Sequence, residues 1–220
     1  MADLDSFQDE SDEEMEAMTP AEVLEKMEEA WLNEKFAPEL LDSKTELVEC
    51  MLEQLKEMEE NIKRAKKGDF KVSIHRLEID RIRYILSSYL RRRLEKIEKF
   101  TVHTLEAEKD RSSDDNALMS PAEFKFASEY AQNMESHFKK IVLRHLPDNL
   151  QAMDPTETAP RPNLDSYVFL RVNEKTDGVL VEEETLEAGE EIIDLEVADQ
   201  HLMRYKPVAS LVTSGAVSLI

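Results

Sequence analysis

A helix-start motif occurs twice in this chain and constrains the fold of its first two thirds. TPAE (19–22) and SPAE (120–123) each place a favoured N-cap residue, a proline at the first helical position and a glutamate three residues after the cap. Ser43 and Glu46 repeat the spacing without proline. These signals, and a natural break at Gly68, predict helices over about 20–35, 44–66, 69–108 and 121–146.

The apolar side chains inside two of these segments have helical spacing, which indicates that one face of each helix is covered. One set comprises Leu47, Met51, Leu55, Met58 and Ile62, and the other comprises Phe124, Ala127, Met134, Phe138 and Ile141. We therefore expect an α-helical bundle domain over 19–146. Residues 1–18 carry eight acidic groups and no basic one, and are expected to form a disordered acidic tail.

The sequence pattern changes after residue 146. Four of the eight prolines lie between Pro147 and Pro162, so 147–163 is predicted to be a linker. Over 164–220, β-branched and aromatic residues predict a small β-rich domain, with a hairpin turn at Asp177-Gly178 and a short helix near 207–213. The expected strands are 166–172, 179–182 and 191–197. The expected fold class is α+β: the helical domain followed by the β-rich domain.

The end of the sequence, PVASLVTSGAVSLI (207–220), contains no charged side chain. Because terminal residues normally fray and tolerate polar side chains, Leu219 and Ile220 suggest that this segment is tied into a sheet or covered by a partner. It is too short and too polar for a membrane span, and no membrane partner is expected. A single cysteine and an acidic N-terminus without signal-peptide features predict a cytosolic or nuclear protein.

No motif for catalysis, cofactor binding or metal binding is recognisable. Four glycines leave no dinucleotide or phosphate-binding loop, no histidine follows a glutamate by three positions, and one cysteine cannot build a thiolate zinc site. We expect no catalytic, cofactor-binding or metal-binding residues. A free-standing enzyme that uses carboxylates for catalysis is kept only as a third interpretation, after the two that are given below.

Positive charge is concentrated in an otherwise acidic chain with a formal net charge of −21. Residues 61–100 hold thirteen basic groups against five acidic ones. On a helix, most of these basic groups lie away from an apolar stripe that includes Tyr89, whereas Arg93 falls within the stripe. A buried guanidinium needs a carboxylate, so we predict a buried or subunit-facing pair with Glu34, the alternative being that Arg93 reaches solvent.

The basic segment has two interpretations. Nucleic-acid binding through the 61–100 helix would use its basic face, and Tyr84 is the one aromatic expected to be exposed for stacking. No helix-turn-helix, zinc finger or OB pattern supplies base readout, so contact with protein is favoured.

Several stretches together resemble the Sld-five family of subunits of the eukaryotic GINS complex. They are AWLNEKFAPELL (30–41), SIHRLEIDRIRYILSSYLRRRLEKIEKF (73–100), LDSYVFLRV (164–172) and HLMRYKPVASLVTSGAVSLI (201–220). The resemblance runs in order over roughly 19–220. It implies a helical domain and a small β domain joined by a flexible linker.

The resemblance also implies a function. It implies a non-catalytic structural subunit of a heterotetramer with three Psf subunits, which joins the MCM hexamer and the Cdc-forty-five protein in the CMG replicative helicase, in the nucleus on replicating chromatin. ATP hydrolysis then belongs to other chains, and DNA contact is indirect or weak. The expected partner-interface residues are Trp31, Glu34, Arg81, Arg83, Tyr84, Tyr89, Arg91, Arg93, Leu219 and Ile220.

The acidic tail has two interpretations. With Leu4 and Phe7 among its acids, it suits a tether for a replisome hub that folds on binding, or it serves only as a solubilising tail. Ser6 and Ser11 each precede an acidic residue by three positions, as acid-directed kinases require, although such spacing also arises by chance.

Overall fold

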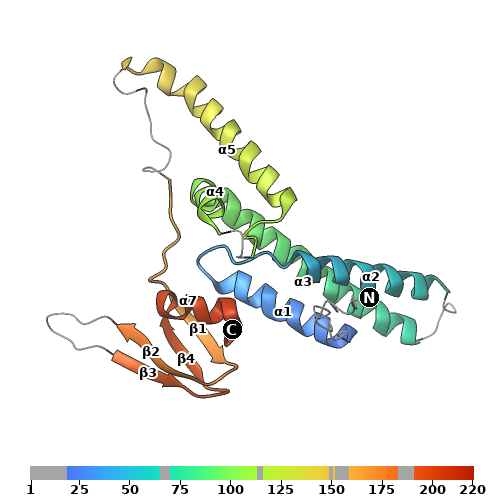
Figure 1. The fold of residues 1–220 in the computed structure, drawn as a ribbon. Coiled ribbons are helices and arrows are strands. Elements are labelled where there is room, and N and C mark those ends of the chain that lie inside the picture. The colour runs from blue at the N-terminus through green and yellow to red at the C-terminus, as the bar shows by residue number, and fades with distance from the viewer. Residues whose placement is uncertain (1–18, 65–69, 113–115, 149–150, 152–158, 183–190) are drawn as a thin grey trace, which may run out of the picture.

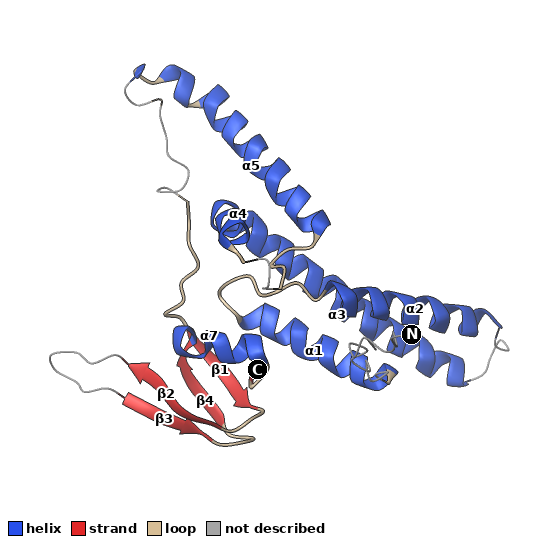
Figure 2. Ribbon diagram, viewed as in Figure 1, coloured by secondary structure: helices blue, strands red, loops and turns tan. Residues whose placement is uncertain are grey.

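The structure is a computed structural model, and it describes residues 19–64, 70–112, 116–148, 151, 159–182 and 191–220. The predicted tail, residues 1–18, and much of the predicted linker lie outside these ranges. Helices occupy the first part of the chain, and a domain with strands follows (Figures 1 and 2). The predicted α+β class is therefore confirmed.

The predicted helices are present with small shifts in their ends. They are α1 (Pro20–Phe36), α2 (Thr45–Arg64), α3 (Phe70–Lys99), α4 (Thr101–Asp110) and α5 (Pro121–Ile141), followed by the 3₁₀ turn η1 (Leu143–His145). Of the three predicted capping boxes, those at Thr19 and at Ser120 form. At the third site the Ser43 hydroxyl pairs with the Thr45 hydroxyl at 2.8 Å.

The helix predicted over 69–108 is divided in two at Phe100. The hydroxyl of Thr101 donates to the carbonyl of Ile97 at 2.7 Å, and that of Thr104 donates to the carbonyl of Phe100 at 3.1 Å. Threonine hydroxyls that bond back to the preceding turn bend helices. The two threonines are therefore the physical reason for the break between α3 and α4.

Helices α1, α2 and α3 pack around one hydrophobic core. Its buried side chains are Val23, Met27, Met51, Leu55, Ile79, Ile82, Ile85, Leu86 and Tyr89. The predicted α2 stripe faces this core, because Leu47, Met58 and Ile62 pack against it as well.

Helix α5 differs from its prediction. It contacts α3 and α4, and then projects away from the body of the protein (Figure 1). Ala127 is fully buried, but every residue from 132 to 142 is exposed. The stripe predicted to be core is therefore covered only near its start, because the helix runs past the elements that would cover the rest.

The C-terminal domain contains two small sheets and one helix. A three-stranded antiparallel sheet has the order β4 (Gln200–Arg204), β1 (Tyr167–Val172) and β5 (Val217–Leu219), and β2 (Thr176–Glu182) pairs with β3 (Glu191–Leu195). Side chains alternate along β1, so that Val168, Leu170 and Val172 face the core with helix α7 (Tyr205–Ser214). The predicted helix near 207–213 is therefore present, whereas β4 and β5 were not predicted.

The hairpin turn predicted at Asp177-Gly178 is wrong. These residues lie inside β2, where the pairing with β3 shifts register between Thr176 and Val179. Gly178 has a φ of +73° and donates its N–H to the side chain of Asp194 at 2.9 Å, so it forms a bulge. The physical reason is that β4 and β5 occupy both edges of β1, which leaves β2 to pair elsewhere.

The end of the chain is tied into the sheet, the first of the two alternatives. Gly215, at a φ of +84°, ends α7 and lets the chain turn into β5. Leu219 is fully buried, and its N–H donates to the side chain of Asn33 on α1 at 2.7 Å. Ala37 and Leu41, which follow α1, pack against the same core. The helical and β-rich parts are thus joined through α1.

Candidate functional site

The predicted ion pair between Arg93 and Glu34 is present and buried. Arg93 on α3 and Glu34 on α1 are each 1% exposed, and Nη1 of Arg93 lies 3.0 Å from Oε2 of Glu34. Lys96, one turn further along α3, donates to the other oxygen of Glu34 at 2.6 Å. The alternative prediction, that Arg93 reaches solvent, is therefore wrong.

Glu123 is a second carboxylate partner that the sequence reasoning missed. Its two oxygens accept from Nε and Nη2 of Arg93 at 2.8 and 3.1 Å, while the same residue closes the capping box of α5 by accepting from the N–H of Ser120 at 2.8 Å. The signal was available: Glu123 lies one helical turn before Ala127 and so shares its buried face.

All the donor capacity of Arg93 is used within the chain. Besides the two carboxylates, Nη1 donates to the carbonyl of Leu41 at 2.7 Å and Nη2 donates to the carbonyl of Leu118 at 2.7 Å. A guanidinium has five N–H donors, and these contacts account for five. The Arg93 network, defined as Arg93, Glu34, Glu123 and Lys96, therefore joins α1, α3, α5 and two connecting loops.

The pKa values of the Arg93 network are set by two opposing effects: burial disfavours each charged form, and pairing with an opposite charge favours it. Burial by itself would lower the pKa of Arg93, but the hydrogen bonds and charge of Glu123, with the neighbouring Glu34, raise it. Burial by itself would raise the pKa of Glu123, but Arg93 holds it below the ordinary 4.5. For Lys96 burial outweighs Glu34, and its pKa is lowered. The network is a charged structural joint whose arginine stays protonated.

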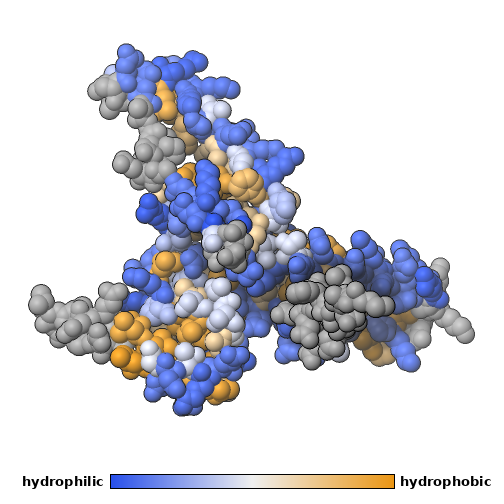
Figure 3. Space-filling view, in the orientation of Figure 1, coloured by the Kyte–Doolittle hydropathy of each residue, from blue (hydrophilic) through white to orange (hydrophobic). Residues whose placement is uncertain are grey.

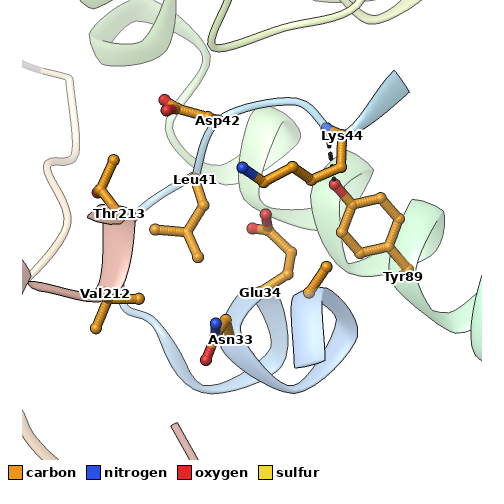
Figure 4. A pocket seen from close by; sticks show the side chains of 9 residues that line it. Asn33, Glu34, Leu41, Asp42, Lys44, Tyr89, Val212 and Thr213 are labelled. Atoms are coloured by element: carbon orange, nitrogen blue, oxygen red, sulfur yellow. Dashed lines mark hydrogen bonds between the residues drawn. The ribbon is translucent and has the colours of Figure 1, made fainter. Parts of the chain in front are cut away.

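A small cavity of about 40 Å³ lies beside this network. Figure 4 shows the side chains around it, with Glu34 and Leu41 directed into the space and Tyr89 accepting a hydrogen bond from the backbone of Lys44 at 3.4 Å. Pockets that take up small-molecule ligands are several hundred Å³ in volume, so this cavity has room for water only.

Arg81 and Arg83, two of the basic α3 residues that were predicted to lie at an interface, are exposed and paired with carboxylates. Arg81 forms ion pairs with Glu28 of α1 and with Glu78, and Arg83 pairs with Glu59 of α2 and with Asp80. Their guanidinium groups therefore hold neighbouring helices together at the surface.

The aromatic residues of this prediction divide between surface and core. Tyr84 is 65% exposed, as expected, and its ring and the Trp31 ring form a T-shaped pair with 6.0 Å between centroids. Trp31 also donates its indole N–H to Ser88 at 2.9 Å. Tyr89, by contrast, is buried. A direct interface role is open to Tyr84 and to Arg91, which is exposed, and stays a prediction.

The remaining candidates are covered by the chain itself. Arg93, Glu34, Tyr89 and Leu219 are each at most 2% exposed. Ile220 is half-buried, and its N–H donates to the carbonyl of Phe169 at 3.1 Å. An effect of these buried residues on a partner must therefore act through the fold, and their interface role stays a prediction.

The apolar stripe on α5 was recognised in the sequence but was wrongly expected to be covered as part of the core. Its members follow the alternating three-and-four spacing of a coiled-coil seam, in the order Phe124, Ala127, Ala131, Met134, Phe138 and Ile141. Phe124, Met134, Phe138 and Ile141 are between 37% and 57% exposed. Figure 3 shows apolar atoms along this projecting helix. We call these six residues the α5 seam.

Among the described residues, no group of three or more His, Cys, Asp and Glu side chains is arranged to hold a metal ion. None of the helices within the described ranges combines the length and apolar character needed to cross a bilayer.

Comparison with known proteins identifies the family. Residues 44–142 match the family model described as GINS complex protein helical bundle domain, and residues 162–220 match that of the C-terminus of DNA replication complex GINS protein SLD5. Proteins named "DNA replication complex GINS protein SLD5" are similar to this chain. The mouse protein is 61% identical over 94% of this chain and 93% of its own length, and the Xenopus laevis protein is 59% identical over 96% of this chain and 95% of its own length. The Arabidopsis thaliana protein is 33% identical over 93% of this chain and 94% of its own length. The chain belongs to the SLD5 family of GINS proteins.

Proposed function

We propose that this protein acts in DNA replication as a non-catalytic structural subunit of a GINS heterotetramer, with three Psf-family subunits as its partners. The names of its relatives support the role in DNA replication and the membership of a complex. Through GINS it supports the assembly and activity of the CMG helicase with the MCM hexamer and the Cdc-forty-five protein, in the nucleus.

The observation that carries the structural part of this proposal is the α5 seam. Burying one large apolar side chain contributes roughly 1.5–3 kcal/mol, and four such side chains stand exposed on α5, which the other described elements cover only near its start. The spacing suits a second helix packed alongside α5. A sister subunit that offers an amphipathic helix is the partner that this surface fits.

The second candidate function is nucleic-acid binding through residues 61–100. The ion pairs of Arg81 and Arg83 weigh against it, because phosphate contact would have to compete with carboxylates that are already in place. Assembly is therefore the better supported function.

Co-expression with the three presumed sister subunits tests the proposal. A single species whose mass equals four different chains is expected, and it should show no DNA affinity attributable to residues 61–100. If the chain remains outside any complex, the proposal fails. If it binds duplex DNA alone, with log affinity falling by about 0.9 per phosphate contact for each unit of log salt, the alternative is favoured.

A further inference from the structure

The sheet β4-β1-β5 has two edge strands, and only one of them is occupied by another described element. At the β5 edge, the N–H of Leu219 donates to the side chain of Asn33 on α1 at 2.7 Å. At the other edge, β4 has β1 as its one strand neighbour among the described residues. Within that part of the chain, β4 is therefore the open edge of the sheet.

The backbone groups of Leu202, at the middle of β4, point toward this open edge. Leu202 lies opposite Phe169 of β1, and the carbonyl of Phe169 accepts from the N–H of Ile220 at 3.1 Å on its other side. The two backbone groups of a strand residue point to the same side, so Phe169 and Leu202 form a pair that exchanges no hydrogen bonds. The N–H and C=O of Leu202 therefore face away from β1, toward the place that an added strand would occupy.

Strand β4 has little of the protection that exposed edges usually carry. Such edges are normally blocked by proline, by a bulge or by charged side chains, lysine above all. The sequence of β4, QHLMR, contains no proline or lysine, and its one charged residue is the last. Its pairing with β1 runs over five residue pairs without a shift, whereas the pairing of β2 with β3 shifts register twice. The edge is therefore straight and able to receive a strand.

The face of the sheet beside this edge is apolar and exposed. Tyr167, Phe169 and Leu202 are 63%, 60% and 56% exposed, and Figure 3 shows apolar side chains gathered over the strands of this domain. We call the outward positions of β1 and β4 the sheet face, and they are Tyr167, Phe169, Arg171, Gln200, Leu202 and Arg204.

The charge of the sheet face is opposite to that of its domain. Residues 164–220 contain twelve acidic residues and four basic ones, yet two of the four, Arg171 and Arg204, stand on the sheet face, which has no acidic residue. The guanidinium carbon of Arg204 lies 5.9 Å from the centre of the Tyr167 ring, beside the apolar side chains. A strand added to β4 would place every second side chain on this face. Apolar and acidic side chains at alternate positions of such a strand would match Leu202 and Arg204.

Two other occupants fit this surface less well. A second copy of the chain would bring two formal charges of −21 together, which opposes self-association. Single-stranded nucleic acid would stack its bases on Tyr167 and Phe169, but the surplus of eight acidic residues in this domain repels phosphate. A short peptide needs only one or two acidic groups, and it obtains affinity from main-chain hydrogen bonds.

We propose that β4 binds an extended acidic peptide segment of a partner protein by strand addition. The segment forms hydrogen bonds with the N–H and C=O of Leu202 and packs an apolar side chain against Leu202 and Phe169. A carboxylate two residues from that side chain lies opposite Arg204. The site is on the C-terminal domain and does not involve the α5 seam, so it is an interaction beyond the proposed assembly.

Binding of a synthetic nonapeptide to the full-length chain tests the proposal. The peptide has valine at its centre, aspartate two positions away on each side and threonine between them, so its pattern is the same in both strand directions. Fluorescence anisotropy should show saturable binding at concentrations up to about 1 mM. Leu202→Pro should lower the affinity about tenfold, because proline has no N–H to donate and is tolerated on an edge strand.

Two variants are matched to Leu202→Pro. Leu202→Ala keeps the N–H and should lower the affinity no more than about fivefold, as expected for one cross-strand contact. Arg204→Glu gives a measurement that does not depend on the folding of the proline variant. It should weaken binding of the aspartate peptide and strengthen binding of the same peptide with lysine in place of aspartate.

Three results would overturn the proposal. The first is the absence of saturable binding by the full-length chain. The second is equal affinity of Leu202→Pro and Leu202→Ala for the peptide, or the same preference between the aspartate and lysine peptides in Arg204→Glu as in the unmodified chain. The third is binding of a labelled thymidine oligonucleotide that Phe169→Ala abolishes, which would make the sheet face a nucleic-acid surface.

Discussion

Residues 207–220 and helix α5 are both rich in apolar side chains, but the chain covers only the first. Leu219 is fully buried between β1 and the end of α1, with its N–H bound to Asn33. Phe138 and Ile141, near the end of α5, are 40% and 57% exposed. The difference is one of position: the chain terminus folds back onto the sheet, whereas α5 leads away from the bundle.

The difference separates residues that hold the fold from residues available to a partner. The Arg93 network and Leu219 belong to the first group, because they join the helical domain to α5 and to the sheet. The exposed members of the α5 seam, Phe124, Met134, Phe138 and Ile141, belong to the second. Substitutions in the first group should lower the stability of the chain, and substitutions in the second should weaken association without changing the fold.

The largest effect is expected for Arg93→Ala. It leaves Glu123 buried without a cation and Glu34 paired only with Lys96, and removing one partner of a buried ion pair costs about 3–5 kcal/mol. Chemical denaturation, followed by circular dichroism, measures the loss in the free energy of unfolding. A loss below about 1 kcal/mol would mean that the joint between α1, α3 and α5 does not hold the fold.

Leu219→Ala tests the other half of the first group. Truncating a fully buried leucine costs about 2–5 kcal/mol, so the free energy of unfolding should fall by that amount in the same denaturation experiment. Leu202→Ala, on the exposed face of β4, is the matched control and should cost much less. If the two variants were equally stable, the end of the chain would not be part of the core.

The pH dependence of stability tests the contribution of Glu123. Its pKa in the folded protein is lower than the ordinary 4.5, so its stabilising contribution is fully present above that pH and is lost as the pH falls through the folded-state pKa. The difference in stability between the protein and Glu123→Gln should therefore be largest above about pH 5 and should shrink toward pH 3. Denaturation curves across this range provide the measurement. A constant difference would contradict the assignment.

The smallest effect is expected for Arg83→Ala. The side chain is 52% exposed and pairs with partly exposed carboxylates of Glu59 and Asp80. Exposed ion pairs contribute about 0.2–1 kcal/mol, so the loss should stay below 1 kcal/mol and should become smaller in high salt. A loss as large as that of Arg93→Ala would remove the distinction between buried and exposed pairs on α3.

Local signals predicted much of the helical domain. The capping boxes at Thr19 and Ser120 marked the starts of α1 and α5 because they depend on neighbouring residues only. Helical spacing also placed Arg93 in the apolar stripe of α3, and the need of a buried guanidinium for a carboxylate pointed to Glu34 as one of two outcomes. Glu123 was missed because its capping role already accounted for its side chain.

The remaining errors concern contacts that are distant in the sequence. Apolar spacing on α5 shows that a surface needs covering but not which element covers it, so Phe138 was expected in the core. Strand β5 has only three residues, and it pairs with β1, a strand that lies far away in the sequence at the start of the domain. Gly178 was taken for a turn because a glycine with positive φ serves equally in a turn and in a bulge.

The central claim is that the α5 seam serves assembly and not the fold, and a double substitution, Met134→Asp with Phe138→Asp, tests it most directly. Both side chains are exposed, so the helical content of the chain should stay the same. Its free energy of unfolding should change by no more than about 0.5 kcal/mol. Gln132→Asp with Ser136→Asp, on another side of α5, is the matched control. Co-purification with the sister subunits should fall at least tenfold for the first pair, since buried charge is costly, and should persist for the control. Normal co-purification of the Met134→Asp, Phe138→Asp variant, or loss of its fold, would contradict the account.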